Sequence, residues 1–113
     1  MSFYTVIKTE LSSKKYILAA LAEMKKRGEI REFAHNERKE TIEVDQDGDI
    51  MNIAKEQAGN YEIGGDNRVV NRFSNRMKQL YAYESIKDNI PLDFEIATET
   101  ETVEGEIKIL LKG

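Results

Sequence analysis

The sequence predicts an α+β fold, in which an antiparallel sheet has two main helices packed on one of its faces. Two segments, 13–27 and 67–88, carry apolar residues at helical spacing. Most of the remaining chain consists of short runs that alternate apolar and polar residues between turn signals, as the strands of such a sheet do. The order approximates a strand-helix-strand-strand unit used twice, so we expect a ferredoxin-like or related arrangement.

The chain opens with a strand and a helix. Residues 3–9 are rich in β-branched and aromatic side chains on both faces, which predicts an interior strand. Ser12 or Ser13 can cap the helix that follows, and Gly28 is placed to end it. The apolar stripe of this helix contains Ile17, Leu18, Leu21 and Met24.

A meander of strands is predicted between the two helices. The runs "EIREFAH", "TIEVD", "DIMNIAKE" and "NYEIGG" are separated by turn signals at Asp47-Gly48 and Gly59-Asn60. We expect Gly64-Gly65-Asp66 to shape the turn into the second helix, with Asp66 or Asn67 as its cap.

The second helix and a closing hairpin complete the fold. The helical stripe in 67–88 consists of Val69, Val70, Phe73, Met77, Leu80 and Tyr81. Pro91 ends the helical region, and "LDFEIATET" and "GEIKILLKG" predict a hairpin around Glu104-Gly105.

Length and composition restrict the class of protein. A chain of 113 residues predicts a single domain, 1–113, with one core. The absence of cysteine excludes disulfides, thiolate metal sites and cysteine nucleophiles, and a net charge of -4 gives no general attraction to nucleic acid. Neither a signal sequence nor a membrane-spanning run is evident, so we expect a soluble, cytoplasmic protein.

Two polar stretches resemble metal or catalytic sites only superficially. "EVDQDGDI" matches the first half of a calcium-binding loop, but Ala54 stands where the twelfth-position glutamate is required, and Asp-Gly between alternating apolar residues predicts a hairpin turn. His35 is the only histidine and has no nucleophile or metal ligand near it in sequence. We therefore expect no catalytic residues, no metal and no cofactor.

The second helix repeats Asn-Arg three times at a spacing of four residues. At 100° per residue the three asparagines, Asn67, Asn71 and Asn75, form an exposed ridge. The arginines form a second ridge toward the apolar stripe, where Arg72, Arg76, Gln79 and Tyr83 make a border that could bind an anion or an acidic partner. The alternative is that the arginine stems simply cover the core while their charges stay in water.

The segments "MSFYTVIKT", "DIMNIAKEQAGNYEIGGD", "NRMKQLYAYESIKD" and "FEIATETETVEGEIKILL" resemble a family of short proteins of unknown function. The family includes hypothetical chloroplast reading frame thirty-five of algal plastids and cyanobacteria. The resemblance is most specific at Gln79, Tyr81, Ala82 and Tyr83, which adds Tyr81 to the candidate binding residues. It implies a stand-alone soluble protein and no assigned activity.

Together these features favour a non-catalytic binding or assembly module with a protein partner, homo-oligomerisation being left open. One alternative is a small enzyme or ligand-binding protein that uses the border of Arg72, Arg76, Gln79, Tyr81 and Tyr83. The other is nucleic-acid binding through the arginine ridge, which the acidic net charge disfavours. No membrane interaction is expected.

Overall fold

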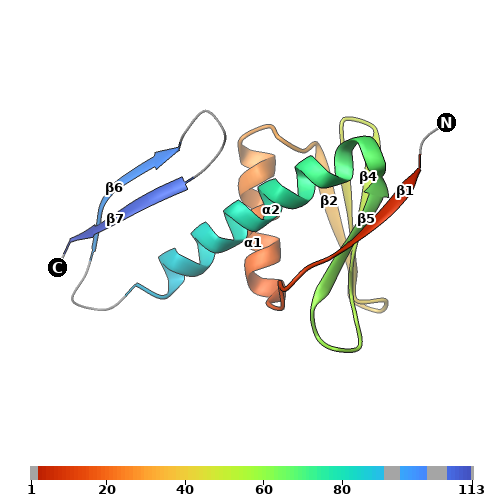
Figure 1. Cartoon of the computed structure of the whole chain (residues 1–113), viewed down its shortest axis with the longest axis horizontal. Coiled ribbons are helices and arrows are strands. Elements are labelled where there is room, and N and C mark those ends of the chain that lie inside the picture. Colours follow the sequence, from red (N-terminus) through yellow and green to blue (C-terminus); the bar gives the residue numbers. More distant parts are fainter. Residues whose placement is uncertain (1–2, 91–94, 102–106, 113) are drawn as a thin grey trace.

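A computed structural model describes residues 3–90, 95–101 and 107–112 and confirms the α+β class (Figure 1). The elements in chain order are β1 (Tyr4–Lys8), α1 (Lys14–Lys26), β2 (Glu32–Asn36), β3 (Thr41–Gln46), β4 (Asp49–Lys55), β5 (Tyr61–Asp66), α2 (Asn67–Asp88), β6 (Glu95–Glu101) and β7 (Ile107–Lys112). Both predicted helices are present, within one residue of the expected ends. Among the described residues, neither helix combines the length and apolarity that a membrane span requires.

The main sheet has five strands in the order β1-β5-β4-β3-β2, and every neighbouring pair is antiparallel. The predicted tight turn joins β3 to β4: Asp47 and Gly48 both have positive φ, 51° and 95°, as a two-residue hairpin requires. The Gly48 N–H donates to Asp45 Oδ1 at 2.9 Å. A side chain that could have been a calcium ligand therefore stabilises the hairpin instead.

Strand β1 corrects one expectation, because it lies at the edge of the sheet and not in its interior. Ile7 points toward the core, whereas Tyr4 and Val6 lie on the uncovered face. The sequence shows apolar residues on both faces of this strand, but that pattern is the same whether the second face is covered or open.

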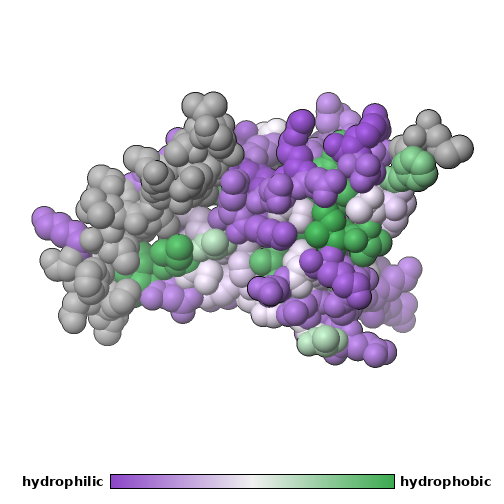
Figure 2. Space-filling view, in the orientation of Figure 1, coloured by the Kyte–Doolittle hydropathy of each residue, from purple (hydrophilic) through white to green (hydrophobic). Residues whose placement is uncertain are grey.

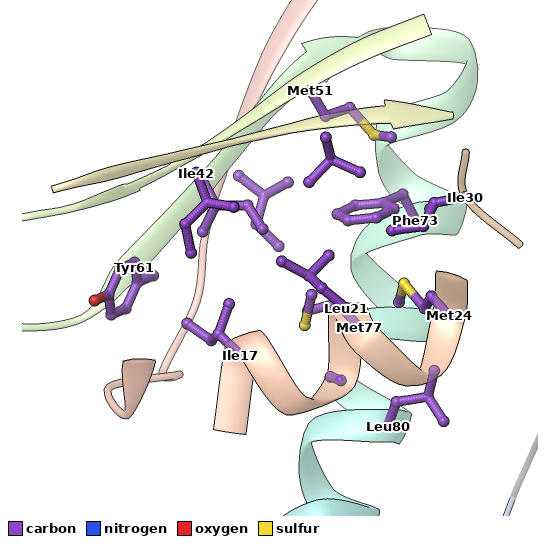
Figure 3. Packing of buried hydrophobic residues seen from close by; sticks show 14 of the residues in the cluster. Ile17, Leu21, Met24, Ile30, Ile42, Met51, Tyr61, Phe73, Met77 and Leu80 are labelled. Atoms are coloured by element: carbon purple, nitrogen blue, oxygen red, sulfur yellow. The ribbon is translucent and has the colours of Figure 1, made fainter. Parts of the chain in front are cut away.

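Both helices cover the same face of the sheet, and the hydrophobic core lies between them and the strands (Figure 3). The helices supply the predicted stripes, including Ile17, Leu21, Phe73 and Met77, which are all at most 2% exposed. The core residues of the sheet are Ile42, Val44, Met51, Ile53, Tyr61 and Ile63.

Gly64 and Gly65 lie within β5 and do not form the expected turn. Neighbouring side chains crowd both positions: Met51 Cγ lies 2.6 Å from a Cβ placed on Gly65, and the Tyr4 hydroxyl lies still closer to one on Gly64, although the exposed Tyr4 side chain has room to move aside. The strand instead runs directly into α2, where Asp66 is the N-cap and accepts a hydrogen bond from the Arg68 N–H. This confirms one of the two expected caps.

The closing hairpin forms a separate two-stranded sheet, with β6 antiparallel to β7. It lies beside α2 at the end of the molecule away from the five-stranded sheet (Figure 1). The ferredoxin-like detail is not confirmed, because these strands do not extend the main sheet. Pro91 and the expected turn at Glu104-Gly105 lie outside the described residues.

Candidate binding groove

An open groove of about 720 Å³ lies between the end of α1, the segment leading to β2, the middle of α2 and β6. We call it the arginine groove. Its lining residues are Met24, Glu29, Ile30, Gln46, Arg72, Phe73, Asn75, Arg76, Lys78, Gln79 and Glu101. The buried side chains of Met24, Ile30 and Phe73 give it an apolar base, and polar or charged side chains surround them.

The groove brings together three of the five predicted site residues. Arg72, Arg76 and Gln79 all line it, because residues separated by three, four and seven positions share one side of a helix. Tyr81 and Tyr83 are not among its lining residues. The predicted border is therefore divided between a groove and two tyrosines with other contacts.

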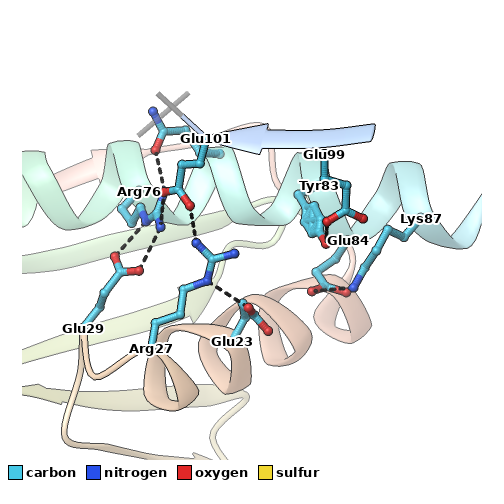
Figure 4. Close-up of polar contacts among 10 residues, drawn as sticks. Glu23, Arg27, Glu29, Arg76, Tyr83, Glu84, Lys87, Glu99 and Glu101 are labelled. Carbon is cyan, nitrogen blue, oxygen red and sulfur yellow. Dashed lines mark hydrogen bonds and ion pairs between the residues drawn. The ribbon is translucent and has the colours of Figure 1, made fainter. Parts of the chain in front are cut away.

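Arg76 is the most enclosed cation of the groove, with a side chain only 15% exposed. Its Nε and Nη2 donate to the two carboxylate oxygens of Glu29 at 2.7 and 2.8 Å, in a bidentate pair (Figure 4). Nη2 also lies 2.7 Å from Glu101 Oε1, and Nη1 is 3.4 Å from Gln79 Oε1. The hydrogen bonds to Glu29 outweigh burial and raise the pKa of Arg76.

Glu101 joins β6 to both helices, because it accepts hydrogen bonds from Arg76 of α2 and Arg27 at the end of α1 (Figure 4). Arg27 also donates to Glu23 Oε1 at 2.8 Å. Burial by itself would raise the pKa of Glu101, but the hydrogen bonds from the two arginines lower it overall. This carboxylate is thus held in its charged form.

Tyr83 makes the second contact with the hairpin. Its hydroxyl donates to Glu99 Oε2 at 2.6 Å, and its side chain is buried against the protein. Burial and the hydrogen bond to the carboxylate raise the pKa of Tyr83 to about 12. The Lys87 ammonium lies 4.5 Å from the ring centroid, on the same helix.

Tyr81 positions the start of α1. Its hydroxyl accepts a hydrogen bond from the Ser13 N–H at 3.0 Å, and its ring meets the Tyr16 ring edge-on, with centroids 5.6 Å apart. Ser13 occupies the N-cap position as expected, but its side chain makes no capping hydrogen bond. Tyr81 therefore has a structural contact that explains its place on the apolar stripe.

Arg72 and Lys78 are the exposed cations of the groove. Within the described part of the chain, neither has an acidic side chain at ion-pairing distance, whereas Arg68, one turn before Arg72, pairs with Asp66 and Asp49. The three asparagines that form the other ridge are exposed, as the helical spacing predicts, but Asn75 also lines the groove, so this ridge is not wholly separate from it.

Sequence reasoning missed the carboxylates that complete the groove. Glu29 lies in the segment after α1, and Glu101 lies on β6, so both are far from α2 along the chain. One signal was available: Glu99 and Glu101 are two residues apart in an alternating run, a spacing that places both on one face of a strand. Two acidic side chains on one face of the closing strand are well placed to meet the arginines of the helix.

His35 lies apart from the groove, on β2, in a shallow concavity beside Glu43 and Asn52. Across residues 3–90, 95–101 and 107–112, no group of three or more His, Asp or Glu side chains is placed to hold a metal ion. In the same ranges, the groove is where three of the predicted site residues, Arg72, Arg76 and Gln79, come together.

Comparison with known proteins finds no family model that matches the chain, no similar curated protein and no similar solved structure. The family resemblance centred on Gln79, Tyr81 and Tyr83 therefore stays a prediction. The groove and its charges are the main physical basis for a function.

Proposed function

We propose that this chain is a non-catalytic binding module, and that its arginine groove receives an acidic segment of a partner protein. The observation that carries the proposal is the exposed Arg72 at the margin of an apolar base formed by Met24, Ile30 and Phe73. A guanidinium beside buried apolar surface binds a carboxylate more strongly than one in open water, because the partner displaces solvent around the pair.

The two groove arginines have different roles in this proposal. Arg76 is already ion-paired with Glu29 and Glu101, so it forms part of the groove lining and is occupied by carboxylates of its own chain. Arg72 and Lys78 remain to contact the partner. We therefore expect the preferred segment to place an Asp or Glu near Arg72 and an apolar side chain over Phe73.

The groove chemistry disfavours nucleic acid as the occupant. Since Arg76 is occupied by Glu29 and Glu101, only Arg72 and Lys78 remain in the groove to contact phosphates, and the whole chain has a net charge of -4. A short protein segment can avoid these carboxylates by presenting a single acidic group to Arg72.

The enzyme alternative also has little support. Tyr83 would be the natural general base of the predicted border, but its pKa is raised to about 12 and its hydroxyl is bonded to Glu99. Such a tyrosine remains protonated at neutral pH, where an efficient base needs a pKa closer to the working pH.

The test is selection of binding peptides from a displayed random library, followed by affinity measurements on the selected peptides. We expect enrichment of an acidic residue next to an apolar one, and Arg72→Glu should weaken binding at least about tenfold. Lys14→Glu is the control, because it reverses the charge of an exposed lysine outside the groove that has no ion pair among the described residues. Selection without acidic enrichment, or equal loss in both variants, would contradict the proposal.

A further inference from the structure

Exposed apolar side chains concentrate at one edge of the main sheet. Phe3, Tyr4 and Val6 are 69%, 63% and 50% exposed, and they belong to β1 or directly precede it. Among the described residues, the other exposed large hydrophobic side chains are Ile50 and Ile86. In Figure 2, hydrophobic surface is visible on the side of the molecule where β1 runs beside the start of α2.

The same edge carries backbone groups that β5 does not use. The Asn67 N–H donates to the Phe3 carbonyl at 2.7 Å, and the Thr9 N–H donates to the Tyr61 carbonyl at 3.2 Å. Hydrogen-bonding direction alternates along an antiparallel strand, so the N–H and C=O groups of Tyr4, Val6 and Lys8 face away from β5.

This edge has little of the protection that usually prevents strands from pairing. Within β1 there is no proline, and Lys8, at its end, is the only charged residue. An exposed, apolar edge strand generally associates with another strand unless charge, proline or a covering segment prevents it. Its surface is therefore suited to adding a strand.

We propose that β1 pairs with β1 of a second copy of this chain, antiparallel and with the two-fold axis at Val6. Val6 then lies opposite Val6 of the second copy, and Tyr4 lies opposite Lys8. This register uses all three outward-facing residues on both strands, giving about six backbone hydrogen bonds. A shift by two residues in either direction would leave some of these groups unpaired.

The charges favour a second copy in this register. In the existing sheet, Tyr4 lies opposite Asp66 of β5, and Lys8 lies opposite Glu62 of the same strand. The row across the new seam is then Glu62 and Lys8 of one copy followed by Tyr4 and Asp66 of the other, so each lysine lies beside Glu62 of its own copy and opposite a tyrosine of the second copy. Register shifts that bring the two lysines opposite each other would place like charges together.

The proposed pairing joins the two five-stranded sheets into one and keeps the binding grooves accessible. A two-fold axis perpendicular to the sheet leaves the helices of both copies on the same face. None of the residues that line the arginine groove belongs to β1. The hairpin lies at the end of the molecule opposite β1 (Figure 1). The dimer is thus independent of the proposed groove function, and each idea can fail without the other.

Charge-swap variants at Val6 test the register. Sedimentation over about 1–300 µM should show a concentration-dependent wild-type dimer. Val6→Lys and Val6→Glu should each raise the dimer dissociation constant at least about tenfold through repulsion across the axis, and mixing the two should restore association. Ile50→Lys and Ile50→Glu are controls on the same face but on β4, and they should not change association.

A cysteine variant covers the case in which the charged variants fail to fold. The chain has no cysteine, and directly opposed residues in an antiparallel pair have Cα atoms about 5.5 Å apart, within disulfide range. Val6→Cys should form a disulfide-linked dimer on mild oxidation, whereas Ile50→Cys should not. A wild-type monomer throughout the concentration range, or equal crosslinking of both cysteine variants, would overturn the proposal.

Discussion

Arg72 and Arg76 are one helical turn apart and carry the same side chain, but their surroundings differ. Arg76 is 15% exposed and bonded to Glu29 and Glu101, whereas Arg72 is exposed. We expect Arg76→Gln to lower the free energy of unfolding by about 1–3 kcal/mol, because Glu29 loses its bidentate partner and Glu101 keeps only Arg27. Arg72→Gln should change it by less than about 0.5 kcal/mol. Urea unfolding of both variants measures this, and equal effects would contradict it.

The adjacent glycines of β5 give a second paired comparison. A methyl group on Gly65 would meet Met51, which is fully buried, whereas one on Gly64 would meet the hydroxyl end of the exposed Tyr4. Since Tyr4 can rotate away, Gly64→Ala should cost less than about 0.5 kcal/mol, and Gly65→Ala about 1–3 kcal/mol through overpacking. Thermal unfolding of the two variants distinguishes them, and a larger loss at Gly64 would show that Tyr4 is held rigidly.

Tyr83 should be recognisable by its titration. Burial and the bond to Glu99 raise its pKa to about 12, so its stabilising effect is complete below the unfolded value of about 10 and is lost as pH rises through 12. Burial also raises the pKa of Tyr61, so ultraviolet titration of tyrosinate should contain a late component that loses the amplitude of one tyrosine, but does not vanish, in Tyr83→Phe. An unchanged late amplitude in this variant would show that Tyr83 does not contribute to it.

At the scale of the element, α2 has an exposed ridge that is not optimal for a helix. Asn71 and Asn75 are exposed, and asparagine has a lower helix propensity than alanine. Asn71→Ala and Asn75→Ala should each stabilise the protein by roughly 0.5 kcal/mol. Denaturant midpoints test this, and a destabilised Asn71→Ala would indicate an unrecognised contact of that side chain.

The helices and tight turns could be predicted from sequence because their signals are local. The stripe from Ile17 to Met24 and the Asp47-Gly48 turn depend on spacing and backbone preference within a few residues. The edge position of β1 could not, because strand order depends on pairings between distant segments: β1 joins β5 across more than fifty residues. Gly64 and Gly65 were misassigned for the same reason, since the side chains that lie against them come from β1 and β4.

For the candidate groove, too, the sequence predicted the residues that share one helix but not the partners that come from other segments. Arg72, Arg76 and Gln79 follow from helical geometry, and they do lie together. Their carboxylate partners come from the segment after α1 and from β6, and helix periodicity contains no information about either. Tyr81 was placed on the apolar stripe and Tyr83 on the border, but the contacts they make at Ser13 and Glu99 depend on tertiary packing.

At the scale of the whole molecule, carboxylates connect the hairpin to the helices. Among the described residues, the side-chain bonds between these parts are those of Glu99 with Tyr83 and of Glu101 with Arg27 and Arg76. The ion pairs of Glu101 with Arg27 and Arg76 need a charged carboxylate, so this part of the hairpin's attachment depends on pH. Because Glu101 also lines the arginine groove, loss of this contact would open one wall of the proposed binding site.

The last prediction concerns this coupling in acid. The folded pKa of Glu101 is lowered, so its contribution to stability is present above the unfolded value of about 4.3 and is lost as pH falls through the folded pKa. The difference in melting temperature between wild type and Glu101→Gln should therefore be largest near neutral pH and should shrink below about pH 4. Glu43→Gln is the control, because Glu43 is exposed on β3 and has no ion pair among the described residues. A difference for Glu101→Gln that stays constant from neutral to acidic pH would show that its charge does not hold the hairpin, and that only its size and packing matter.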